Sequence, residues 1–270
     1  MTFLAELPES HSTGRTREIY EEMKYLGGVP MVALIFRHLA TLPGGIEWVW
    51  EAIGPAWRAG RLQEAAWRIA REAPMEPIAA IPREALGPLG VDAAGLREIR
   101  TVCEAYNRAN PENMLTVLCL ARMLGGAKAS RGIEARAWTP PPAPGPLAPM
   151  ADVASMPPEV AALLDLVAAP GEPGSPRVVP SLYRHFAHRP RFLALAITLL
   201  LQRFRDGSID RSVAALSAAM NAAADELVRG LSAPPAPDAG MSVALRRFGG
   251  IVIPQMIGVG ALLERALPPG

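Results

Sequence analysis

A five-residue pattern occurs twice in this chain, and its two copies lie 147 positions apart. Phe36–Ala40 reads F-R-H-L-A, and Tyr183–Ala187 reads Y-R-H-F-A. The register continues without a gap, so that Gly60 falls on Gly207. At an offset of 143, a later set of pairs follows: Pro111 with Pro254, Arg122 with Arg265, and Leu124 with Leu267. The pattern predicts two copies of one unit, packed about a pseudo-twofold axis as in a fused dimer.

Apolar residues recur at helical spacing through most of the chain, whereas period-two alternation is scarce. Ile19, Met23 and Leu26, for example, fall at i, i+4 and i+7, the spacing of one helix face. We therefore predict an all-α protein made of two homologous helical repeats. Among the predicted helices are Val29–Ala40, Ala93–Arg108, Pro111–Leu124 and Ser242–Leu267, with Pro111 at a first helical position.

Prolines mark the boundary between the two copies. Six of them lie between Thr139 and Pro149, which excludes a helix and favours an extended, semi-rigid spacer. We predict a first repeat over residues 1–131, a Pro-rich linker over residues 132–157 and a second repeat over residues 158–270.

Charge and cysteine content exclude several classes of function. The chain has 27 basic and 26 acidic residues among 270, so that nucleic acid is not an expected partner. No apolar run is long enough for a membrane span and no signal peptide opens the chain, so we expect a cytoplasmic protein. Cys103 and Cys119 lack C-x-x-C spacing and are expected to be buried. The histidines lack metal-ligand spacing, and neither a metal nor a cofactor is predicted.

Amides cluster in the first copy. The stretch Tyr106–Asn113 holds three asparagines, and its counterpart in the second copy holds none. Asn110 is explained if it caps a helix that begins at Pro111, but Asn113 is not. His38 and His185 are repeat-equivalent, which favours structural roles. The repeated pair Arg37 and Arg184 allows either substrate carboxylate binding or salt bridges, and salt bridges are the more common use.

Several segments together resemble one enzyme family. They are R-E-I-Y-E-E-M-K followed by G-V-P, the F-R-H-L-A segment, N-P-E-N-M-L in the first copy and V-P-S-L-Y-R-H-F-A in the second. Over about Thr16 to Leu267 the chain resembles the group I 2-haloacid dehalogenases, which are all-helical, inverting hydrolases. The resemblance implies repeats similar to the alkylhydroperoxidase D fold, with the active site between them. It also implies that an Asp of the second repeat deprotonates a water, which attacks the halogen-bearing carbon directly.

The resemblance carries over to individual residues. Ser181 matches the serine before the family's catalytic Asp, and it would hold the substrate carboxylate together with backbone N–H groups. The Asp position itself is Leu182, and no acidic residue occurs between Glu172 and Asp206. The pocket positions of the first copy are Val32, Leu34 and Ile35, and the assisting amide is Asn113 or Asn110. The alternative that another residue, such as His185 or Glu112, supplies the general base stays open.

Two functions follow from this comparison. The first is hydrolysis of small 2-halocarboxylic acids, which Leu182 would impair or abolish. The second is a non-catalytic relative that binds a small carboxylate or apolar ligand between the repeats. A peroxidase of the alkylhydroperoxidase D type would need a C-x-x-C motif that this chain lacks. A homodimer is compatible with either function.

Overall fold

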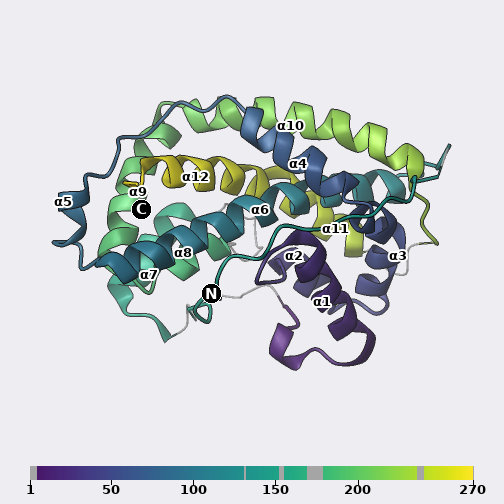
Figure 1. Ribbon diagram of the computed structural model, residues 1–270, viewed down its shortest axis with the longest axis horizontal. Coiled ribbons are helices and arrows are strands. Elements are labelled where there is room, and N and C mark those ends of the chain that lie inside the picture. The colour runs from purple at the N-terminus through teal and green to yellow at the C-terminus, as the bar shows by residue number, and fades with distance from the viewer. Residues whose placement is uncertain (1–4, 131, 152–154, 169–178, 236–239, 270) are drawn as a thin grey trace.

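Helices make up the architecture of the protein (Figure 1). The computed structural model describes residues 5–130, 132–151, 155–168, 179–235 and 240–269, and no β-strand occurs among them. The predicted all-α class is therefore confirmed. The helices are α1 (Gly14–Gly27), α2 (Leu34–Leu39), α3 (Gly45–Arg58), α4 (Arg61–Glu72), α5 (Arg83–Leu86), α6 (Ala93–Leu124), α7 (Pro158–Val167), α8 (Ser181–Phe186), α9 (Pro190–Arg205), α10 (Ser208–Leu227), α11 (Gly240–Arg247) and α12 (Ile253–Ala266). None of the described helices is long and apolar enough to cross a membrane.

Helix α6 runs through the middle of the molecule, beside α12 (Figure 1). It is 32 residues long and begins after Asp92, whose side chain accepts a hydrogen bond of 2.7 Å from the backbone N–H of Gly95. The prediction of two helices that meet at Pro111 is wrong, because Pro111 lies inside one continuous helix. A proline inside a helix costs about 3 kcal/mol, and burial of residues 109–117 offsets this cost. The capping role predicted for Asn110 is wrong for the same reason.

Two hydrophobic cores share the long helices. One core contains α1 to α4 and the C-terminal half of α6. The other core contains α5, α7 to α9 and the N-terminal half of α6. Residues of α10 and α12 are likewise divided between both cores. Trp57 ties α3 to α6 in the first core by donating a hydrogen bond of 3.1 Å to the Thr116 hydroxyl. Each core is thus built from both halves of the sequence.

Helix boundaries recur at the offset of the sequence pattern. Leu34 and Ser181 begin α2 and α8, and Arg61 and Ser208 begin α4 and α10. The residue before each member of the second pair is a glycine, at φ of 65° for Gly60 and 71° for Gly207. Such left-handed φ values favour glycine. The packing of the repeats about a pseudo-twofold axis stays a prediction.

The Pro-rich linker is packed against both halves of the chain, and His188 of the second half contacts the Pro149 carbonyl at 2.7 Å. No helix forms over residues 132–151, as predicted, while residues 152–154 lie outside the described part. The indole N–H of Trp138 donates a hydrogen bond of 3.1 Å to the Leu26 carbonyl, and Arg136 pairs with Glu64 at 2.5 Å. The linker is therefore anchored to α1 and α4 by side-chain contacts that its composition does not predict.

The C-terminal segment is interrupted where one helix was predicted. A π-helical turn at Phe248–Val252 separates α11 from α12. A π turn adds a residue per turn and shifts the faces of the helices on either side of it.

Glu112 provides a test of this packing. Its side chain is fully buried, and neither carboxyl oxygen has a hydrogen-bond partner. Burial therefore raises the pKa of Glu112 well above its usual value. A carboxyl group whose pKa is raised by folding stabilises the folded state fully at pH values below its unfolded-state pKa of about 4.3. This stabilisation is lost as the pH rises through the folded-state pKa.

We expect Glu112→Gln to make unfolding less dependent on pH. Chemical unfolding at pH 5 and pH 8 should show that wild type loses at least about 1.4 kcal/mol more than the variant over this interval. Parallel losses in the two proteins would contradict a buried, protonated Glu112.

Candidate ligand-binding cavity

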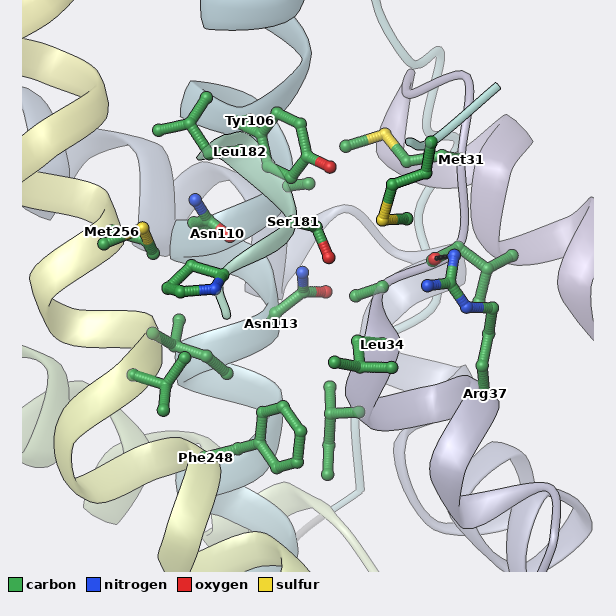
Figure 2. A pocket seen from close by; sticks show the side chains of 18 residues that line it. Met31, Leu34, Arg37, Tyr106, Asn110, Asn113, Ser181, Leu182, Phe248 and Met256 are labelled. Carbon is green, nitrogen blue, oxygen red and sulfur yellow. Dashed lines mark hydrogen bonds between the residues drawn. The ribbon is translucent and has the colours of Figure 1, made fainter. Parts of the chain in front are cut away.

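A cavity of about 50 Å³ lies where α2, α6, α8 and the segment from Phe248 into α12 meet (Figure 2). All seven residues predicted from the sequence as site residues line it: Val32, Leu34, Ile35, Asn110, Asn113, Ser181 and Leu182. The fold thus brings together residues that lie up to 150 positions apart. That they form a functional site stays a prediction.

Positions that line the cavity come in pairs at the two repeat offsets. Four of these pairs are Leu34 with Ser181, Ile35 with Leu182, Asn110 with Ile253, and Asn113 with Met256. Three of these four pairs differ in polarity, whereas Ile35 and Leu182 are both apolar. Helix α6 presents Asn110 and Asn113 where α12 presents Ile253 and Met256. The α6 side of the cavity is therefore polar and the neighbouring α12 side is apolar.

Three polar side chains of this cavity share one face of α6. Tyr106, Asn110 and Asn113 lie at i, i+4 and i+7, a spacing that places them one above the other. In Figure 2 the Tyr106 hydroxyl, the Ser181 hydroxyl and the Asn113 amide point toward the same space. Asn110 lies between Leu182 and Met256 in this view, and its amide nitrogen is buried without a hydrogen-bond partner.

Arg37 reaches this space from the opposite side (Figure 2). Its side chain is 8% exposed. Its Nε donates to a carboxylate oxygen of Glu6 at 2.6 Å, and its Nη1 donates to the Val32 carbonyl at 3.1 Å. The salt bridge expected for Arg37 is present, but the same guanidinium also lines the cavity.

Tyr106 is paired with His185 behind the cavity wall. The Tyr106 hydroxyl lies 2.9 Å from Nδ1 of His185, and the same nitrogen lies 3.2 Å from the Ser181 carbonyl. Burial lowers the pKa of His185 and raises that of Tyr106, so that both groups are neutral near pH 7. His38, its counterpart in the first copy, contacts the Ala5 carbonyl at 2.7 Å and does not line the cavity.

No acidic side chain belongs to the described lining of the cavity. Leu182, at the position expected for the catalytic Asp, is 1% exposed. Glu112 is absent from the lining, and a Cβ at Gly27 would lie 2.6 Å from its carboxylate oxygen, which places the Glu112 side chain against α1. A carboxylate base is therefore missing from the described wall, and Glu112 does not supply one.

Other chemistries find little support in the described residues. No group of three or more His, Cys, Asp or Glu side chains there could hold a metal ion. Both cysteines are buried as predicted, and burial raises their pKa values to about 12. Thiols with such pKa values are not nucleophiles near neutral pH.

The sequence prediction missed several lining residues, among them Arg37, Tyr106, Phe248 and Met256. A signal was present for Tyr106, because it lies four and seven residues before the two site asparagines. This spacing carries no information if the helix is assumed to end before Pro111, because the three residues would then not share one helix face. The turn that brings Phe248 to the cavity has no evident signal in the local sequence.

Comparisons with known proteins agree with this picture. No family model matches the chain. The chain is 31% identical over 176 residues to a configuration-inverting 2-haloacid dehalogenase from Alcaligenes xylosoxydans xylosoxydans, and the match covers 62% of this chain. The matched region spans 58% of that relative.

Solved structures of D-2-haloacid dehalogenase have the same fold. The complex with L-LA superposes with a TM-score of 0.65 at 18% identity, over 98% of this chain and 91% of that one. A complex of a mutant with D-2-CPA gives 0.63 at 17% identity, over the same shares of the two chains. The chain is therefore similar in sequence to a configuration-inverting 2-haloacid dehalogenase over 62% of its length, and it has the all-helical fold of D-2-haloacid dehalogenase.

Proposed function

We propose that the cavity binds a small 2-substituted carboxylic acid of the 2-haloacid kind, and that the protein does not hydrolyse this ligand efficiently. The observation that carries the proposal is the separation of polar and apolar groups within the cavity. Arg37, Ser181 and Asn113 direct polar groups at one space, while Met256 and Phe248 line the other side.

The polar groups suit a carboxylate. Hydrogen bonds from a guanidinium to a carboxylate are charge-assisted and stronger than those between neutral groups. Hydroxyl and amide groups supply further donors. The volume of about 50 Å³ is that of a few waters, since one water needs about 10–15 Å³. A short-chain acid fits these limits, and its halogen or methyl group would face the apolar wall.

The apolar residue at position 182 argues against efficient hydrolysis. Direct attack by water on the halogen-bearing carbon needs a group that accepts the proton of the water. A general base contributes about 10²- to 10⁴-fold to the rate. With Leu182 in place of a carboxylate, the proposed function is ligand binding with turnover reduced by roughly that factor.

A second candidate, slow hydrolysis, is favoured by the contact between Tyr106 and His185. The phenol oxygen would take a proton from the attacking water while the phenol proton passes to Nδ1 of His185. The halide would leave with the electron pair of the carbon–halogen bond. Two neutral groups form a weak proton acceptor, so only low rates are expected from this arrangement.

Binding is tested with 2-chloropropionate by titration calorimetry. We expect Asn113→Ala to weaken binding by about tenfold or more, because a hydrogen bond to a charged group is lost. Asn107→Ala is the matched control, since Asn107 lies on the same helix but bonds to Glu264 at 2.7 Å outside this cavity. Equal affinities in wild type and Asn113→Ala would show that Asn113 does not contact the ligand.

The role of position 182 is tested by halide release from 2-chloropropionate. We expect Leu182→Asp to exceed both wild type and Leu182→Asn by about a hundredfold, because only the aspartate can act as a base. Its rate should rise with pH, because burial raises the pKa of the introduced carboxyl. Equal rates for folded Leu182→Asp and Leu182→Asn would show that position 182 does not face the reacting carbon.

The second candidate has its own test. Any wild-type halide release that uses the Tyr106–His185 pair should fall at least tenfold in Tyr106→Phe. Tyr25→Phe, at a residue 66% exposed, is the control. Release that is unchanged in Tyr106→Phe would exclude the pair as the proton acceptor.

A further inference from the structure

The segment before α1 packs against the part of the chain that carries Arg37. The backbone N–H of Leu7 donates to the Arg37 carbonyl at 2.9 Å, and the Tyr20 hydroxyl donates to the Leu7 carbonyl at 3.2 Å. Further along, a carboxylate oxygen of Glu9 accepts from the Val32 backbone N–H at 2.8 Å. Two acidic side chains of this segment, Glu6 and Glu9, thus contact residues that line the cavity.

Glu6 places a negative charge directly on Arg37. The distance from Nε of Arg37 to the Glu6 carboxylate oxygen is 2.6 Å, and the side chains are 8% and 26% exposed respectively. Arg37 is the only basic side chain among the described residues that line the cavity. The ion pair therefore compensates the one positive charge available there to an anionic ligand.

We infer that Glu6 is a built-in competitor of the ligand: its carboxylate holds Arg37 while the cavity is empty and gives way when a small carboxylate binds. This inference rests on the proposed function. It adds that the affinity for anions is set by a residue outside the cavity, on the segment before α1.

Hydrogen-bond capacity supports competition. Of the five guanidinium N–H groups, Glu6 takes the one on Nε, and the Val32 carbonyl takes one on Nη1. The side of the guanidinium formed by Nε and Nη2, which could hold a carboxylate bidentately, is thus partly occupied. A second carboxylate beside Glu6 would also be repelled by it, and this repulsion is weakly screened at a buried site.

The exposures of the two partners decide which carboxylate yields. Glu6 is more exposed than Arg37, so a small movement is enough to return its carboxylate to solvent. Glu9 anchors the segment independently, through Val32 and through an ion pair of 3.1 Å with Lys24. The Glu9 contacts can therefore stay in place while movement of the stretch Ala5–Leu7 releases Glu6.

The test compares a charged ligand with its neutral counterpart by titration calorimetry. We expect Glu6→Gln to bind 2-chloropropionate about tenfold more tightly than wild type, because the competing charge is removed. Binding of 2-chloropropionamide should not change. Glu18→Gln alters the net charge equally at an exposed residue of α1 that pairs with Arg15, and it should match wild type for both ligands.

Three results would overturn the inference. Weaker binding of the acid to Glu6→Gln would mean that Glu6 orients Arg37 for the ligand. An equal gain for the amide, or in Glu18→Gln, would mean that competition at Arg37 is not the cause. Unchanged affinity of Glu6→Gln, with clear binding by wild type, would refute the inference and leave the proposed function intact. Absence of binding in all variants would instead refute the proposed function.

A measurement on wild type does not depend on any variant. The Leu7 N–H is bonded to the Arg37 carbonyl, so release of Glu6 should expose it. We expect hydrogen exchange at Leu7 to speed up when 2-chloropropionate is added and to stay constant when 2-chloropropionamide is added. Slower or constant exchange with saturating acid would contradict the displacement of Glu6.

Discussion

The continuity of α6 through Pro111 is the constraint on which the rest of the structure depends. A helix that ended before Pro111 would turn Asn110 into a cap and would separate Tyr106 from Asn113. Because the helix continues, all three side chains share one face and reach one cavity. The same continuity carries α6 from one hydrophobic core into the other, and residues of both cores line the cavity.

The cavity lies where corresponding positions of the two halves of the chain meet. A symmetric pair of walls would offer a ligand two equivalent orientations. The exchange of Asn110 and Asn113 for Ile253 and Met256 removes that equivalence, so that an acid bound as we propose would have one favoured orientation. The positive charge of Arg37 is compensated by Glu6, a residue that does not line the cavity.

Periodicity predicts the all-helical class, but it begins a helix at Val29 where α2 begins at Leu34. The resemblance to a known family then leads to seven residues that line one cavity. Arg37 was missed as a lining residue because a repeated arginine favours a salt bridge, and the direction of a long side chain is not encoded in local spacing. Pro111 misled the helix prediction because a local steric cost was outweighed by burial, which depends on residues distant in the sequence.

The proposed site is tested most directly by a crystal structure of the wild-type protein soaked with 2-bromopropionate, with the bromine located by its anomalous signal. The account predicts an intact acid, with its carboxylate at Arg37, Ser181 and Asn113 and its bromine against Met256 and Phe248. An empty cavity, or a carboxylate placed against Met256, would contradict it.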